Sequence, residues 1–192
     1  MSYWIIGTLI LSLVSPISYT KSILAGKAKP HKITRLVVWL ASIAGLLGVL
    51  KSDSASGIIF AGIFFARATY LLFMALKFGT GGASKLDKYC LIIAVFALLA
   101  YVITGNGLLA ICFGILSDLI GYIPTFVKTW HKPSSEDPTF FIIESIASLF
   151  AVFAIWELRV DIIFPVYYLV SGLFVTFLIY RKRLLALLPS HS

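Results

Sequence analysis

Polar and charged side chains are scarce in this 192-residue sequence. It has no glutamine, a single asparagine at position 106 and only 12% charged residues, whereas 60% of its residues are hydrophobic. A soluble domain is roughly half apolar and about one quarter charged. A water-soluble globule of this size has no room to bury so many apolar side chains, so we exclude that class. The 15 Phe, 9 Tyr and 4 Trp residues exclude a disordered chain, because such chains are poor in aromatics.

Cysteine and histidine are also rare, and their positions exclude several kinds of site. Cys90 and Cys112 lie in different apolar runs, so we expect two buried thiols and neither a disulfide nor a metal pair. His31, His131 and His191 lie between or after the apolar runs, which leaves no histidine for a metal site or a catalytic triad inside them. A Gly-Lys-Ser phosphate loop is absent too. The sequence therefore predicts no metal, no cofactor and no enzymatic activity.

Seven apolar runs are long enough, or nearly so, to cross a bilayer as helices, for which roughly 17 to 25 residues are needed. The runs are continuous rather than alternating, which argues against an outer-membrane barrel. The first run lacks a basic start and a cleavage site, so we expect a mature helix there and not a signal peptide. We predict an all-α membrane protein with seven transmembrane helices, at residues 3–25, 33–50, 57–78, 89–104, 108–127, 139–156 and 162–180.

The formal net charge of +8 comes from basic residues that lie mostly between these runs. With the N-terminus outside, the outer loops hold only Lys51 and Arg159, whereas the cytoplasmic loops and tail hold nearly all other Lys and Arg residues, Arg35 among them. This bias predicts an outside N-terminus and a cytoplasmic C-terminus. The basic charge therefore indicates orientation in a lipid bilayer and not binding of nucleic acid. The absence of an organelle-targeting segment favours a prokaryotic inner membrane.

The chain also repeats itself at a shift of 103 residues. This shift aligns Lys-Pro at 29–30 with Lys-Pro at 132–133, and Ser-Ile-Ala at 42–44 with Ser-Ile-Ala at 145–147. Apolar matches are common in such a composition, but these polar matches in one register are not. Self-similarity of this kind indicates a fold made of repeated units.

The repeat divides the chain into two three-helix units, residues 3–78 and 108–183, joined by a linker helix within residues 79–107. Because one helix separates the units, both have the same orientation in the membrane, and a central path lies between them. Parallel repeats of this kind occur in transporters, with the solute site near the middle of the membrane.

Local sequence carries a family resemblance over about residues 3 to 183. Pro16 and Pro124 lie in the first helix of each unit, and a basic and polar loop follows each, at 26–32 and 129–138. This plan resembles the SWEET and PQ-loop transporter superfamily, which implies a seven-helix 3+1+3 fold and solute transport. The Pro-Gln dipeptide is absent, and the paired asparagines of SWEET proteins are replaced by Arg67 and Ser171. Nicotinamide riboside carriers resemble the same plan, so the fold does not select the solute.

Three charged residues lie well inside predicted helices, away from the helix ends. Arg67 and Asp118 are near the midpoints of the third and fifth helices, and Glu144 lies in the sixth. A charge in the membrane is costly, so it usually faces the interior of the bundle and has a partner. We expect Arg67 to pair with Asp118 or Glu144 between the two units. The pair either binds or couples a solute, or is a structural salt bridge.

Neighbouring residues extend the candidate site. Tyr122 follows Asp118 by one helical turn, Tyr70 follows Arg67 by three residues, and Trp39 is placed to stack on a ring. The alternative for each of these aromatic residues is core packing or a place in an interfacial aromatic belt. Pro16 and Pro124 interrupt the backbone hydrogen bonds of their helices and are candidate hinges for alternating access, or simple kinks.

The sequence supports two classes of function. The first is a transporter for a small polar solute, a sugar or another small metabolite, with a site between the two units. The second is an accessory or structural membrane protein without transport activity. An intramembrane enzyme is disfavoured, because no nucleophile–base pair or metal-ligand spacing is present. Whether the chain forms a homo-oligomer is left open.

Overall fold

Seven long helices make up nearly all of the described chain. The computed structural model describes residues 3–49, 55–82, 84–103, 107–154 and 162–187, and within these ranges it contains no strand. The fold is all-α there, as predicted. The elements are α1 (Tyr3–Leu24), α2 (Lys32–Val49), α3 (Ala55–Phe78), α4 (Lys85–Ile103), α5 (Gly107–His131), a short 3-10 helix η1 (Pro133–Ser135), α6 (Pro138–Ala154) and α7 (Ile163–Leu187).

Polar capping residues set the start of α4. α4 begins at Lys85 rather than at residue 89, where the apolar run starts. The Asp87 backbone N–H donates to Ser84 Oγ (3.0 Å), and the Asp87 carboxylate accepts from the Gly82 N–H (2.6 Å) and the Ser84 N–H (3.4 Å). This reciprocal capping satisfies N–H groups that a helix start leaves unpaired. Polar capping, and not hydropathy, sets this boundary.

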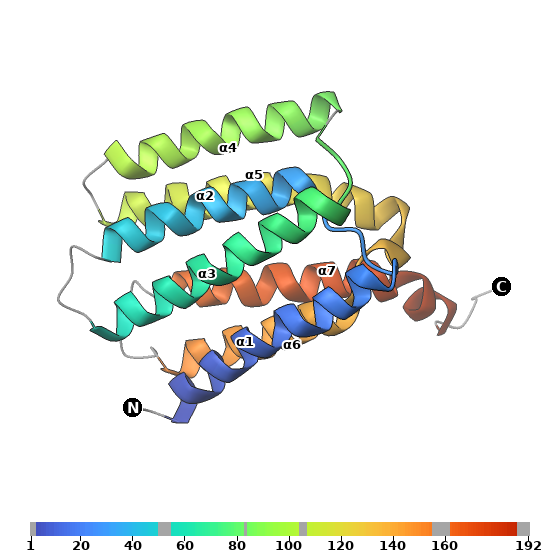
Figure 1. Cartoon of the computed structure of the whole chain (residues 1–192), viewed down its shortest axis with the longest axis horizontal. Coiled ribbons are helices and arrows are strands. Elements are labelled where there is room, and N and C mark those ends of the chain that lie inside the picture. Colours follow the sequence, from blue (N-terminus) through green and yellow to red (C-terminus); the bar gives the residue numbers. More distant parts are fainter. Residues whose placement is uncertain (1–2, 50–54, 83, 104–106, 155–161, 188–192) are drawn as a thin grey trace.

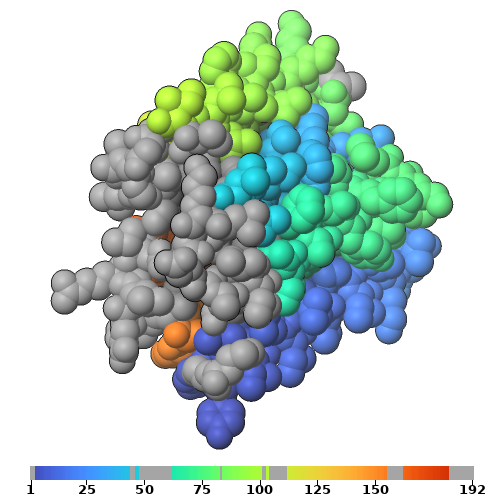
Figure 2. Space-filling view, turned by 60° about the vertical axis from the view of Figure 1, so that its left-hand side comes forward, coloured from blue at the N-terminus to red at the C-terminus, as the bar shows by residue number. Residues whose placement is uncertain are grey.

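The helices are arranged in two layers (Figure 1). In one layer α3 lies between α1 and α2 and contacts both, and in the other α7 lies between α5 and α6 and contacts both. The layers meet where α1 contacts α6 and where α2 contacts α5, while α4 packs on α2 and α5. Figure 2 shows the same order across the molecule, with α4 at one edge, α1 at the other, and α2 and α3 between them.

The two central helices, α3 and α7, have no close backbone contact with each other in the described part of the chain. Their side chains meet instead, since the rings of Phe64 and Tyr168 lie 5.8 Å apart between centroids. The layers are therefore held together at their edges and leave side-chain-lined space at their centre. This arrangement locates the candidate site described below.

Two helices, Tyr3–Leu24 and Ile163–Arg181, are long and apolar enough to cross a membrane, as judged on the described residues. Seven membrane spans therefore stay a prediction. The start of α1 and the end of α7 lie at opposite ends of the molecule (Figure 1). Lys51 and Arg159, the basic residues expected in outer loops, lie outside the described residues.

The two cysteines differ in their surroundings. Cys90 in α4 is buried, as expected, whereas Cys112 in α5 is exposed, which corrects the expectation of two buried thiols. Both are free thiols. An apolar run in a bundle whose exterior is apolar does not distinguish the two faces of a helix, so hydropathy alone did not locate Cys112.

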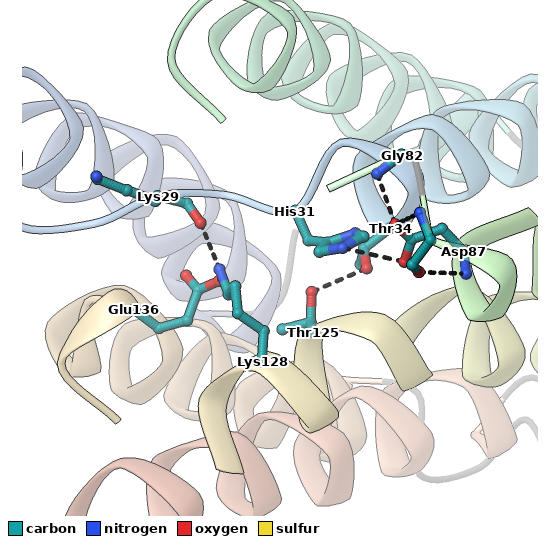
Figure 3. Close-up of polar contacts among 9 residues, drawn as sticks. Lys29, His31, Thr34, Gly82, Asp87, Thr125, Lys128 and Glu136 are labelled. Carbon is teal, nitrogen blue, oxygen red and sulfur yellow. Dashed lines mark hydrogen bonds and ion pairs between the residues drawn. The ribbon is translucent and has the colours of Figure 1, made fainter. Parts of the chain in front are cut away.

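The loops between α1 and α2, between α3 and α4, and between α5 and α6 contact one another at the end of the bundle where α1 ends and α2 begins. We call this end the basic end (Figure 3). The Thr80 N–H donates to the Pro30 carbonyl, and the Lys32 N–H donates to the Thr80 carbonyl, both at 2.9 Å. His31 Nε2 lies 3.3 Å from Asp87 Oδ1, and His31 and Asp87 are both buried. The Lys29 N–H donates to the Ser135 carbonyl at 2.9 Å. The loops before α2, α4 and α6 are therefore connected to one another by these contacts.

We predict that Gly121→Ala lowers the stability of the bundle. A Cβ atom at Gly121 would lie 2.5 Å from Val37 Cγ1, so α5 would have to move away from α2. Overpacking of this kind costs about 1–3 kcal/mol. Thermal unfolding in detergent should show a lower melting temperature for this variant.

The matched control for Gly121→Ala is Gly62→Ala in α3, where an added Cβ meets nothing within 4 Å. Alanine favours helix more than glycine does, so this variant should be as stable as the parent or slightly more stable. Equal melting temperatures for the two variants would contradict the close packing of α5 on α2.

We predict that acidification destabilises the basic end through His31. Burial lowers the pKa of the His31 imidazole below its ordinary value near 6.5, although the Asp87 carboxylate opposes this shift. The unfolded chain then binds the proton at a higher pH than the folded protein. The stability gained from a neutral His31 is complete above pH 6.5 and is lost as the pH falls through the lowered pKa.

Melting temperatures of the parent and of His31→Gln between pH 7.5 and 5 test this prediction. The parent should lose more stability on acidification than the variant, because glutamine has no proton to bind in this range. Other titrating groups are shared by both proteins and cancel in the comparison. Parallel curves for the two proteins would contradict the prediction.

Candidate functional site

An ion pair connects the two layers near the centre of the bundle. Arg67 Nη1 of α3 donates a hydrogen bond to Glu144 Oε2 of α6, and Ser15 Oγ of α1 donates one to Glu144 Oε1. The two charged side chains are 13% and 19% exposed. The Arg67 guanidinium also lies 5.0 Å from the centroid of the Phe64 ring. Of the two partners expected for Arg67, the structure provides Glu144.

A cavity of about 30 Å³ lies beside this pair. Its wall contains residues from both layers, because α2 and α3 contribute from one and α5, α6 and α7 from the other. A cavity of this size holds one or two water molecules. A second cavity of about 20 Å³ shares part of this wall. The residues around the first cavity are Arg35, Val38, Phe64, Arg67, Ala68, Leu71, Tyr122, Phe140, Glu144 and Tyr168.

Arg35 is in this wall, which corrects its assignment to a cytoplasmic loop. It lies in the first turn of α2 and is only 6% exposed. Its guanidinium carbon lies 5.1 Å from the Tyr19 ring centroid and 5.2 Å from the Phe140 ring centroid. Within the described ranges, no carboxylate lies within 4 Å of it. The available signal was its position inside the apolar run 33–50, while the surrounding lysines suggested a loop.

Asp118 is buried but lies outside the cavity wall. The Tyr167 hydroxyl of α7 donates to Asp118 Oδ2 at 2.7 Å. Asp118 Oδ1 is buried and has no hydrogen-bond partner in the described part of the chain. The structure therefore separates Asp118 from Arg67. This separation leaves Asp118 as a second polar position between α5 and α7, next to the site and not part of the ion pair.

Of the three aromatic candidates, one lines the cavity and two lie outside it. Tyr122 lines both cavities, and its ring lies 5.7 Å from that of Phe126. Trp39 and Tyr70 line neither. The Trp39 indole N–H donates to Thr69 Oγ1 at 3.0 Å, and the hydroxyls of Tyr70 and Thr20 are 2.6 Å apart. Trp39 and Tyr70 therefore connect helices outside the site.

Tyr168 and Phe140 are cavity residues that the sequence did not single out. Each stands beside a second aromatic residue, in the pairs Tyr167–Tyr168 and Phe140–Phe141, and the chain has many aromatic residues. Nothing in the pattern distinguishes the member that faces the cavity. Only the rotation of α6 and α7 against α3 makes that choice.

Between the cavity and the basic end, polar contacts connect the helices and loops. The Tyr19 hydroxyl donates to Glu136 Oε2 at 2.5 Å, and the Tyr19 ring stacks on Phe140 with centroids 4.4 Å apart. Glu136 also pairs with Lys128, whose ammonium donates to the Lys29 carbonyl oxygen (Figure 3). These contacts join α1 and its loop to α5 and the loop before α6, so both halves of the chain meet beneath the cavity.

The two prolines predicted as hinges are buried inside α1 and α5. Both helices continue through Pro16 and Pro124 to their basic-end termini. Pro16 lies next to Ser15 and Pro124 lies two residues after Tyr122, so both are close in sequence to residues that contact the site. Their role as hinges stays a prediction.

The site offers charge and aromatic surface rather than reactive groups. The polar groups in its wall are two guanidiniums, one carboxylate and two phenol hydroxyls. In the described part of the chain, no three His, Cys, Asp or Glu side chains are grouped so as to hold a metal ion. An arrangement of this kind is suited to holding a small charged molecule by ion pairing and ring contacts.

Comparison of the chain with protein-family models, with curated protein sequences and with solved structures finds no match.

Proposed function

We propose that this chain is a multi-pass membrane transporter for a small polar solute, built on a plan similar to that of SWEET and PQ-loop proteins. Its two units, residues 3–78 and 108–183, move against each other around the central cavity, and residues 79–107 link them. The observation that carries the proposal is the position of this cavity between the two layers, where Arg67 of one bonds Glu144 of the other.

The pairing of helices supports the two-unit plan. In residues 3–78 the third helix packs between the first and second, and in residues 108–183 the same order recurs. A two-fold relation between the units turns the contact of α1 with α6 into the contact of α5 with α2, and both contacts exist. The relation leaves α3 and α7 as equivalent central helices on either side of the cavity.

The distribution of polarity supports a membrane location. The helices have 17 to 25 residues, which corresponds to roughly 26–38 Å at 1.5 Å per residue, close to the hydrocarbon thickness of about 30 Å. Large apolar side chains are exposed along α4, at Ile92, Phe96 and Leu99, and along α7, at Val170, Leu173 and Phe177. Charged residues such as Arg35 and Asp118 are buried instead. Apolar outside and polar inside is the pattern that lipid requires.

Transport requires a conformational change from the structure described here. A cavity of about 30 Å³ is much smaller than the 300–1,000 Å³ typical of small-molecule sites. The contacts among Tyr19, Glu136 and Lys128 close the basic end. We therefore assign this structure to a state closed at that end, and solute entry separates the two layers.

The small cavity also favours the alternative, an accessory or structural membrane protein. In that case Arg67 and Glu144 are a permanent bridge between the layers. Flux measurements distinguish the two. We expect saturable uptake of at least one of labelled glucose, alanine or benzoate into proteoliposomes that contain the purified chain, measured with and without a pH gradient. Protein-free liposomes are the control, and absence of uptake for all three favours the structural alternative.

We predict that the Arg67–Glu144 pair is needed for flux beyond its effect on stability. Arg67→Met or Glu144→Gln alone leaves a buried charge without its partner, which costs about 3–5 kcal/mol for a fully buried pair and less here, since both residues are partly exposed. Both single variants should therefore have a lower melting temperature and reduced flux.

The double variant Arg67→Met with Glu144→Leu separates the two roles of the pair. Removing both charges restores stability, because no unpaired charge is left inside. If the pair takes part in transport, the double variant is as stable as the parent and still lacks flux. Recovery of flux together with stability would identify the pair as a structural bridge only.

A further inference from the structure

We infer that the central cavity binds a small monocarboxylate with an apolar body, and that Arg35 receives its carboxylate group. This inference rests on the proposed function, and it names the class of solute that the site takes. It starts from a buried guanidinium that lines the cavity, lies over two aromatic rings and, among the described residues, has no carboxylate within 4 Å.

The nearby carboxylates are already engaged. Glu144 bonds Arg67 and Ser15, and Glu136 bonds Lys128 and Tyr19. Neither has an oxygen within 4 Å of the Arg35 guanidinium. The cavity wall therefore has two guanidiniums against one carboxylate, and Arg35 is the guanidinium without a salt-bridge partner. Glu136 and Asp118 act on Arg35 only electrostatically, from beyond 4 Å.

A buried guanidinium without a salt-bridge partner is costly inside a membrane protein. Contact with the faces of Tyr19 and Phe140 offsets part of that cost, since the negative face of an aromatic ring attracts a cation. A bound carboxylate would compensate the remaining charge and match the fork of the guanidinium with two hydrogen bonds. A neutral sugar leaves the charge in place, and a cationic solute is repelled by it.

The rest of the wall defines the body of the ligand. Phe64, Tyr122 and Tyr168 present rings to the cavity, and Val38 and Leu71 present aliphatic side chains. Such a surface favours a flat or apolar group next to the carboxylate. One guanidinium without a salt-bridge partner matches one negative charge, which favours a monocarboxylate over a dicarboxylate.

Arg35 also connects the site to the closed basic end. Its guanidinium lies over the Tyr19 ring, and the Tyr19 hydroxyl bonds Glu136, which pairs with Lys128. A carboxylate that draws Arg35 away from Tyr19 weakens the stacking of Tyr19 on Phe140 beneath the cavity. Ligand charge and opening of the basic end are then linked through a single side chain.

Binding of benzoate and of its neutral isostere benzamide to the full chain in detergent, measured by calorimetry, tests the inference. We expect benzoate to bind at least tenfold more tightly than benzamide. Arg35→Met should weaken benzoate at least tenfold and leave benzamide unchanged. Arg35→Lys should weaken benzoate several-fold, because an ammonium keeps the charge but not the paired donors. The matched control is Lys27→Met, an exposed basic residue near the same end, which should bind benzoate as the parent does.

Each outcome decides the inference. Equal affinity for benzoate and benzamide, binding of neither, or unchanged benzoate affinity in Arg35→Met overturns it. If Arg35→Met does not fold, the parent's preference for benzoate together with the weaker binding of Arg35→Lys decides instead.

Flux separates this inference from the proposed function. Arg35-dependent benzoate binding without benzoate flux supports the binding site and counts against transport. Saturable glucose flux with no preference for benzoate over benzamide supports transport and overturns the carboxylate site.

Discussion

Charges enclosed between helices need partners from other helices, and this requirement organises the centre of the protein. Arg67 and Glu144 come from α3 and α6, and Ser15 of α1 supplies a further hydrogen bond. Three helices from both halves of the chain are therefore tied at one point. In the proposed membrane location, apolar surface contributes little to the choice among helix neighbours, so such polar contacts have a large share in specifying which helices meet.

The same requirement explains the difference between the two arginines of the cavity wall. Arg67 has a carboxylate partner, whereas Arg35 is held against the rings of Tyr19 and Phe140. Arg67 is paired within the fold, whereas Arg35 has no carboxylate within 4 Å among the described residues. The proposed monocarboxylate site follows from this difference, and the proposed closure of the basic end accounts for the small volume of the cavity.

Helix positions were largely predictable from the sequence, because long apolar runs bounded by polar residues have few alternatives. The helix predicted at 33–50 spans Lys32–Val49 in the structure, and the helix predicted at 57–78 spans Ala55–Phe78. α4 began earlier than its run because Ser84 and Asp87 cap it. For the site, charge inside an apolar run indicated that Arg67 would pair with Asp118 or Glu144, but it did not choose between the two carboxylates.

The amino-acid sequence by itself determined the helical class, the approximate ends of the helices and the presence of costly charges within them, because these properties depend on composition and on spacing along the chain. Only the tertiary structure decided that Glu144 and not Asp118 bonds Arg67, that Arg35 lines the cavity, and that Trp39 and Tyr70 lie outside it. The physical reason is that these outcomes depend on how each helix is rotated about its axis and which neighbour it meets. In a chain this rich in apolar residues, hydropathy is nearly the same on every face of a helix, so the rotation is set by contacts between residues far apart in the sequence.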